Sequence, residues 1–263
     1  MKVVASTGLL PILTILMPVY NEIATISAIL ERVKAALPGV TKEIVIVDDG
    51  SRDGTRAWLS ETFSSVADET SICSGEASSH AFSSECLVRV IFHSSNKGKG
   101  GALQTAMRAA TGDVLVIQDA DLEYDPDDWQ GMYDLIAVKK VADVVYGSRF
   151  YGKPHRSLYF HHYVANRLIS LIFNILCNQT LTDVETCYKM FTREVMDSLK
   201  LTANDFGIEI QISTQIALEP RWRIYETGIH YYGRTYLEGK KIGWKDGLKA
   251  LWYLFRYRVN PGN

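Results

Sequence analysis

Four carboxylates stand close together in the stretch GDVLVIQDADLEYDP, at residues 112–126: Asp119, Asp121, Glu123 and Asp125. They follow an apolar run typical of a buried strand, so their mutual repulsion is costly unless a cation lies among them. In an extended segment alternate residues point the same way, which places Asp119, Asp121 and Glu123 on one side. Carboxylate oxygens suit Mg²⁺ or Mn²⁺, so the sequence predicts a divalent-metal site, with a solvated acidic turn as the alternative.

Two other segments carry acidic side chains directly after a strand-like run. MPVYNE contains Glu22, whose carboxylate could accept hydrogen bonds from a nucleotide base or ribose. In VDDGSRDGT, Asp53 and Thr55 are expected to cap a helix. That leaves Asp48 and Asp49 free to accept from ribose hydroxyls or a base N–H, as the acidic residue of dinucleotide folds does.

A further segment, NKGKGG, places Lys97 and Lys99 among glycines just before a predicted helix. Amide groups, a helix N-terminus and the two lysines could together face an anion. The GxxxxGK[ST] spacing of a P-loop is missing, and no GxGxxG follows the first strand, which counts against a nicotinamide or flavin enzyme. Because ligands bind at the carboxyl ends of parallel strands, we expect these segments and the acidic stretch to converge on one crevice.

The elements that must position these residues follow an alternating pattern. Val- and Ile-rich runs predict strands at 13–17, 43–49, 87–93, 112–121 and 143–148, and helical patterns occupy 26–37, 55–63 and 101–110. Strands alternating with helices indicate an α/β fold, with a Rossmann-like, mostly parallel sheet covered on both faces.

Two regions depart from this alternation. The Ser-rich segment 64–87 has no sustained period and is interpreted as a surface insertion loop within a catalytic domain spanning residues 1–240. Residues 241–263 form a predicted amphipathic helix in which Trp252 and Phe255 alternate with Arg256 and Arg258. Such a helix suits a membrane surface, and packing against the sheet is the alternative. The apolar stretch 159–177 is interrupted by His161 and other polar residues, so no transmembrane helix is predicted.

Composition excludes some classes of protein. Lys and Arg (28) nearly balance Asp and Glu (30), so no global basic field indicates nucleic-acid binding. The four cysteines show no CxxC spacing, which favours reduced thiols in a cytoplasmic protein and argues against a zinc site.

Taken in order, these segments resemble the inverting family-2 glycosyltransferases of GT-A fold. The resemblance rests on MPVYNE, IVIVDDGSRDGT, NKGKGGALQTAMRAATGD, QDADLEYDP, GSRF, LTDVETCYKMF and YGRTYLEGKKIGWKDG, and runs from about residue 12 to 252 except for the Ser-rich insertion. Within the family the chain is most similar to the dolichyl-phosphate mannose synthase and polyprenyl-phosphate glycosyltransferase group.

The resemblance implies roles for individual residues. Asp119 and Asp121 match a metal-binding DxD, and Glu123 matches a third position that assists the metal. The positions that match nucleotide-holding residues are Pro18, Tyr20, Glu22 and Asp49. The basic positions near the donor diphosphate and acceptor phosphate are matched by Arg149, Arg234 and Lys240. GRTYLEGKKIG is interpreted as a flap that closes over the acceptor, with a fixed surface loop as the alternative.

The resemblance thus implies metal-dependent transfer of a hexose from a UDP- or GDP-sugar to polyprenyl phosphate. The phosphate is already an anion, whereas a sugar hydroxyl as acceptor would require a carboxylate base such as Asp183, Glu185 or Glu209. A catalytically silent nucleotide-sugar-binding scaffold is the alternative of another class. The expected setting is the cytoplasm, peripheral at the cytoplasmic face of a membrane, with a homodimer or a separate membrane partner as further possibilities.

Overall fold

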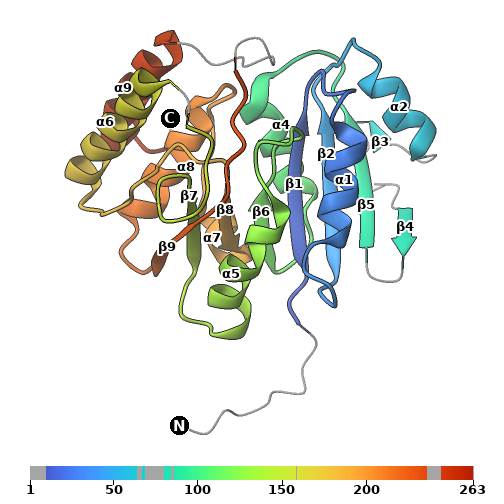
Figure 1. The fold of residues 1–263 in the computed structure, drawn as a ribbon, viewed down its shortest axis with the longest axis horizontal. Helices are drawn as coiled ribbons and strands as arrows, with labels where there is room; N and C mark the ends of the chain where they lie inside the picture. The colour runs from blue at the N-terminus through green and yellow to red at the C-terminus, as the bar shows by residue number, and fades with distance from the viewer. Residues whose placement is uncertain are drawn as a thin grey trace, which may run out of the picture.

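The computed structural model describes residues 10–63, 67–68, 80–83, 86–157, 159–235 and 244–262. Their strands form one sheet (Figure 1). Its order is β3 (Ala67–Asp68), β5 (Cys86–Phe92), β2 (Lys42–Asp48), β1 (Leu13–Val19), β6 (Val114–Ile117), β8 (Lys189–Thr192), β7 (Val144–Ser148) and β9 (Ile224–Gly228), and β4 (His80–Ser83) pairs with β5.

The sheet is mostly parallel, as predicted. β1 pairs in parallel with β2 and β6, and β5 with β2, while β8 runs antiparallel to both β6 and β7. β9 is parallel to β7. The strands β1, β2, β5, β6, β7 and β9 therefore all end at one edge of the sheet, and the segment that leads into β8 enters at that same edge.

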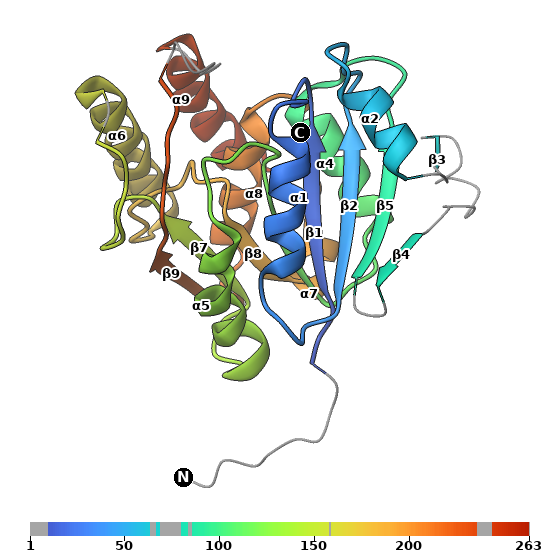
Figure 2. The same cartoon turned by 45° about the vertical axis from the view of Figure 1, so that its right-hand side comes forward.

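Helices cover both faces of this sheet (Figures 1 and 2). α1 (Ile26–Ala35) and α5 (Trp129–Tyr133) lie on one face, and α4 (Gly98–Ala109) and α8 (Gly207–Leu218) on the other. α1 shows why: Ile26, Ile29, Leu30 and Val33 recur at helical spacing and are all buried against the strands. The shorter helices are α2 (Thr55–Thr62) and α7 (Arg193–Ser198), with a 3₁₀ turn at Pro126–Asp128 and a π-helical turn at Asp134–Val138.

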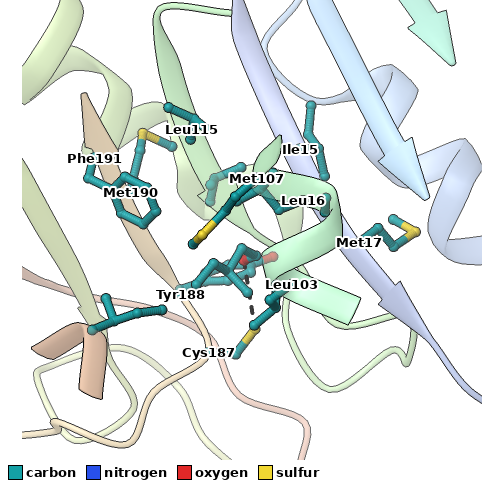
Figure 3. Close-up of a cluster of buried hydrophobic side chains, with 14 of the residues drawn as sticks. Ile15, Leu16, Met17, Leu103, Met107, Leu115, Cys187, Tyr188, Met190 and Phe191 are labelled. Carbon is teal, nitrogen blue, oxygen red and sulfur yellow. Dashed lines mark hydrogen bonds between the residues drawn. The ribbon is translucent and has the colours of Figure 1, made fainter. Parts of the chain in front are cut away.

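The core beneath the edge at which the parallel strands end is apolar and includes a cysteine (Figure 3). Met17 of β1, Leu103 of α4 and Met190 of β8 are buried in it. Cys187 is buried beside them, and its thiol donates to the carbonyl of Ile117 at 3.7 Å. A packing role for Cys187 follows, as is usual for a buried free cysteine.

The predicted elements are confirmed with shifts of a few residues at their ends, except in the Ser-rich segment. The expectation of a loop over 64–87 is wrong for its described parts, because β3 and β4 extend the sheet beside β5 and residues 86–87 begin β5 itself. The side chains of Cys86 and Val88 on β5 are buried in the core. Pairing with β3 and β4 gives the backbone N–H and C=O groups of this strand hydrogen-bond partners, which a solvated loop would not provide. The remainder of the segment lies outside the described residues.

Two long helices, α6 (Phe160–Cys177) and α9 (Trp244–Val259), pack side by side at the β7–β9 side of the molecule (Figures 1 and 2). α9 buries Ala250, Leu254 and Tyr257, so it packs on the body of the protein, while Trp252 and Phe255 stay exposed. No helix in the described part of the chain has both the length and the apolar character needed to cross a bilayer.

Candidate active site

The polar segments singled out in the sequence meet at the carboxyl edge of the sheet. Thr25, at the start of α1, joins two of them: its hydroxyl donates to the carbonyl of Ala120 at 2.9 Å and to Glu22 Oε2 at 3.0 Å. The segment after β9 completes the group, because the guanidinium of Arg234 lies 3.9 Å from Glu22 Oε2. The predicted convergence of strand ends therefore holds for the segments after β1 and β6, and the segment after β9, which the prediction did not include, joins them.

Arg234 lies among the carboxylates that follow β6. Its Nη2 is 2.5 Å from Asp121 Oδ2, and its Nε and backbone N–H donate to Glu123 Oε1 at 2.9 and 3.0 Å. The hydroxyl of Tyr231 donates to Glu123 Oε2 at 2.8 Å. Glu123 is thus held by three donor groups of two residues, Tyr231 and Arg234, which lie more than 100 positions away in the sequence.

Asp119 has a different cation. The Nζ of Lys99 lies 2.8 and 3.0 Å from its two carboxylate oxygens, and 3.0 Å from Glu209 Oε1. Glu209 Oε2 in turn pairs with the fully buried Lys189 at 2.5 Å. A chain of alternating charges therefore runs from the acidic stretch through α4 into α8.

Burial and like charges shift the pKa values of these groups. Burial, followed by the charges of Asp119 and Glu123, raises the pKa of Asp121 to about 7 against the opposing effect of Arg234. Burial alone would lower the pKa of Lys99, but Asp119 and Glu209 hold it well above its ordinary value. Lys99 is therefore charged at neutral pH. The three carboxylates at 119, 121 and 123 nevertheless share only two cations, Lys99 and Arg234.

The carboxylates at 119, 121 and 123 suit a hard divalent cation by their chemistry. Yet among the described residues no group of three or more Asp, Glu, His or Cys side chains is arranged as a ready-made metal site. Each of these carboxylates instead faces a protein cation, Lys99 or Arg234. The donor set fits Mg²⁺ or Mn²⁺ by its chemistry, and two cations of the protein lie against it.

The expectation that Asp48 and Asp49 are free for a nucleotide is wrong in this structure. Asp48 is fully buried and accepts from the Nε of Arg56 at 2.7 Å. Asp49 accepts from the backbone N–H groups of Lys97 and Gly98, both at 2.8 Å, and lies 2.7 Å from His93 Nδ1. Both carboxylates serve the protein itself, because each finds buried donors nearby.

The same contacts correct the anion site predicted at NKGKGG. The amide of Gly98 is bonded to Asp49, and that of Gly101 donates to the carbonyl of Asn204 at 3.2 Å. The anion at the N-terminus of α4 is therefore Asp49, which accepts from the amide of Gly98, the first residue of the helix. The side chain of Lys99 lies against the acidic stretch, where it contacts Asp119.

The turn after β1 is built differently from what its sequence suggests. Tyr20 is 40% exposed at the end of the strand, and Asn21 adopts a left-handed backbone with φ of 54°. Asn21 holds this turn against the next strand end: its N–H donates to Ser51 Oγ at 2.9 Å, and its side chain accepts from the N–H of Arg52 at 2.8 Å. Pro18 lies within β1, so the strand runs past the end predicted for it at residue 17.

Arg149 follows β7 and is held by Asp183. Its Nε and Nη2 donate to the two oxygens of Asp183 at 2.7 and 2.8 Å, and its backbone N–H to Oδ2 at 3.0 Å. The carboxylate of Glu226, on β9, accepts from the N–H groups of Thr182 and Asp183 at 2.8 and 3.2 Å. Asp183 is fully buried, so its role here is to order this loop through Arg149.

Of the three carboxylates considered as a base, only Glu185 makes no hydrogen bond or ion pair within the described residues. Burial raises its pKa to about 7, with Arg149 acting in the opposite direction. Asp183 and Glu209 are committed to ion pairs. Lys240 lies outside the described residues, and of the predicted flap only residues 233–235, which include Arg234, are described.

Comparisons with known proteins identify the family of this chain. The family model described as "Glycosyl transferase family 2" matches residues 14–200. The chain belongs to glycosyl transferase family 2. Its members are glycosyltransferases, so the protein is an enzyme and the silent scaffold loses its support.

Relatives of this family-2 glycosyltransferase carry lipid-phosphate names. The dolichol-phosphate mannosyltransferase of Pyrococcus furiosus is 26% identical over 87% of this chain and 60% of its own length. The polyprenol monophosphomannose synthase of Mycolicibacterium smegmatis is 29% identical over 73% of this chain and 65% of its own. The chain thus spans less than two thirds of either. The undecaprenyl-phosphate mannosyltransferase of Micrococcus luteus is 26% identical over 94% and 98% of the two chains.

The fold has solved counterparts of GT-A type. Glucosyl-3-phosphoglycerate synthase from Mycobacterium tuberculosis, in complex with Mn²⁺, UDP-glucose and phosphoglyceric acid, superposes with a TM-score of 0.66 at 17% identity. The match covers 95% of this chain and 80% of that one. The same enzyme with phosphoglyceric acid gives 0.67 at 18% identity. These likenesses establish the predicted GT-A fold.

Proposed function

We propose that this family-2 glycosyltransferase transfers a hexose from a nucleotide sugar to a polyprenyl phosphate, with Mg²⁺ or Mn²⁺ as cofactor. The observation that carries the proposal is the group of carboxylates after β6 that lies against Lys99 and Arg234 at the carboxyl edge of the sheet. Relatives named for dolichol-, polyprenol- and undecaprenyl-phosphate transfer support the lipid acceptor.

In this proposal the cationic side chains position the phosphates. Lys99 reaches the acidic stretch from α4 and Arg234 from the segment after β9, and the donor diphosphate binds between these two cations. Asp119, Asp121 and Glu123 are the residues that would hold the metal. When bound, the ion stabilises the negative charge that develops on the leaving nucleoside diphosphate.

No protein base is required when the acceptor is a phosphate. A phosphate monoester is anionic near neutral pH, so its oxygen attacks the anomeric carbon once the two substrates are aligned. Arg149, which follows β7, is a further basic residue at the carboxyl edge of the sheet, and its three hydrogen bonds to Asp183 keep it rigid there. The protein's main contribution is alignment and charge stabilisation.

The lipid is expected to meet α6 and α9. Phe160 and Ile175 of α6 are 77% and 72% exposed, and Phe255 of α9 is 55% exposed. The guanidinium of Arg258 donates to the carbonyl of Leu176 at 2.7 Å and holds the two helices together. Their exposed apolar side chains would lie among lipid headgroups at the cytoplasmic face of a membrane.

A sugar hydroxyl is the second candidate acceptor, and Glu185 favours it. This carboxylate has no partner among the described residues and a pKa of about 7, which suits a general base near neutral pH. With a hydroxyl acceptor, Glu185→Gln should lower kcat by about a hundredfold or more. With a phosphate acceptor, the same substitution should leave kcat nearly unchanged.

The test is transfer of radiolabel to a short-chain polyprenyl phosphate. UDP-glucose, UDP-galactose, UDP-N-acetylglucosamine and GDP-mannose are each supplied with Mn²⁺ or EDTA. One donor should label the lipid only with Mn²⁺, and Asp121→Ala should reduce transfer by at least about a hundredfold. Asp127→Ala is the matched control, since Asp127 is an exposed carboxylate a few residues downstream. Metal-dependent donor hydrolysis without labelled lipid would refute the lipid-phosphate acceptor.

A further inference from the structure

The carboxylates at 119, 121 and 123 each contact one of two cations of the protein itself. Lys99 contacts both oxygens of Asp119, and Arg234 spans Asp121 and Glu123. The side chains are mostly shielded from water: Arg234 is 25% exposed, and Asp121 and Glu123 are 12% and 14% exposed. Charge-assisted contacts in such surroundings are stronger than surface ion pairs.

A divalent ion and these cations compete for the same oxygens. An ion bound by Asp121 and Glu123 would lie next to the guanidinium of Arg234, and the repulsion between the two would oppose binding. The cation must therefore leave its carboxylates as the ion arrives. A nucleoside diphosphate offers anionic oxygens that match a guanidinium fork and an ammonium, so it supplies new partners for both.

We propose that Arg234 and Lys99 are exchangeable counter-cations, which hold the acidic stretch in the ligand-free protein and pass to the donor diphosphate as the metal binds. Metal and nucleotide then bind cooperatively, each lowering the cost of binding the other. This inference rests on the proposed metal- and nucleotide-dependent function, and it describes how the metal and the nucleotide come to bind at that site.

The two cations differ in what they keep after the exchange. Lys99 retains Glu209 at 3.0 Å, so it stays charged and needs only to turn away from Asp119. Beyond Asp121 and Glu123, the described residues offer Arg234 only Glu22, at 3.9 Å. Arg234 is therefore the cation that depends most on the diphosphate, and it is the one to substitute.

The test measures binding in the absence of turnover. Free Mn²⁺ is followed by electron paramagnetic resonance at pH 8, with and without UDP or GDP. Nucleotide affinity is measured by calorimetry, with and without Mn²⁺. Wild type, Arg234→Gln and Arg234→Lys are compared, and Arg223→Gln is the control, because Arg223 forms a similar fork with Asp143 at 2.7 and 2.9 Å where β9 begins.

Arg234→Gln should bind Mn²⁺ alone on the order of tenfold more tightly than wild type, and bind UDP or GDP alone more weakly. The enhancement of Mn²⁺ binding by nucleotide should shrink by the same factor as the enhancement of nucleotide binding by Mn²⁺, because the coupling is reciprocal. Arg234→Lys keeps the positive charge but loses the guanidinium fork, so its Mn²⁺ and nucleotide affinities should lie between those of wild type and Arg234→Gln. Arg223→Gln should match wild type.

Two results would overturn the inference in distinguishable ways. In the first, wild type binds Mn²⁺ in the presence of nucleotide, and both Arg234 variants bind Mn²⁺ alone with the affinity of wild type and show the same enhancement by nucleotide. This result refutes the counter-cation role, while the proposed function stands. If wild type binds no Mn²⁺ even with UDP or GDP, the metal-dependent function fails together with the inference.

Discussion

Gly100→Ala tests whether backbone contact fixes the start of α4 and hence the position of Lys99. In a helix, alanine is favoured over glycine by about 0.5–1 kcal/mol, so the substitution should stabilise the protein if space allows. Space is lacking here. A Cβ at Gly100 would lie 2.2 Å from the carbonyl oxygen of Ala203 and 2.8 Å from the carbonyl carbon of Asn204.

The size of the effect follows from these distances. Ordinary contacts of a Cβ lie at 3.4–4 Å, so the backbone of residues 203–204 must move by more than an ångström relative to α4. Overpacking of this kind costs about 1–3 kcal/mol or more, and a backbone obstacle places it at the upper end. After the helix-propensity gain, we expect a net loss of about 2 kcal/mol, which lowers Tm by roughly 4–8 °C.

Urea unfolding followed by circular dichroism measures the loss, and Gly131→Ala is the matched control. Gly131 lies in α5 with nothing within 4 Å of its would-be Cβ, so alanine there should be neutral or stabilising by up to about 1 kcal/mol. The displaced α4 should also weaken the Lys99–Asp119 contact, and transfer activity should fall in Gly100→Ala alone. Equal stability of the two variants would refute the reasoning.

Three further predictions follow from the site and its surroundings. Asp183→Asn leaves the largely buried Arg149 without its counter-charge and should lower the free energy of unfolding by about 3 kcal/mol; a loss below about 1 kcal/mol in urea would contradict this. Burial raises the pKa of Glu185 from 4.5 to about 7, so ionisation of this carboxylate lowers the free energy of unfolding. The loss increases as the pH rises between these two values. Glu185→Gln should therefore match wild type near pH 4.5 and exceed it by on the order of 1–3 kcal/mol at pH 8, and a gain independent of pH would oppose it. Ile175→Glu with Phe255→Glu should abolish sedimentation with anionic vesicles while leaving the far-ultraviolet spectrum unchanged; undiminished sedimentation would exclude these helices as the membrane surface.

The elements of the fold were accessible from the sequence because their signals are local. Runs such as VLVI at 114–117 and the apolar spacing of α1 specify strand and helix through side-chain periodicity. The short strands β3 and β4 were missed, since a Ser-rich segment carries no such period and pairs only because β5 offers it an edge. Their existence depends on a neighbour and not on their own residues.

The candidate site was predicted in part for the same reason. Asp119, Asp121 and Glu123 are two residues apart, and their spacing after a strand marks them without further information. Asp49 and the amides of NKGKGG were assigned to a ligand, whereas Asp49 accepts from the backbone N–H groups of Lys97 and Gly98, 48 and 49 residues further along the chain. No local signal distinguishes a carboxylate that meets a nucleotide from one that caps a distant helix.

The sequence by itself determined which chemical groups the protein has and the strand ends from which they project, because alternation and turn residues act within a few positions of the chain. Only the tertiary structure decided how their charges are paired. Arg234 meets Asp121 over a separation of 113 residues, and Arg149 meets Asp183 over 34. Such pairs depend on strand order, since β9 and β6 bring their ends to one edge only after β7 and β8 lie between them.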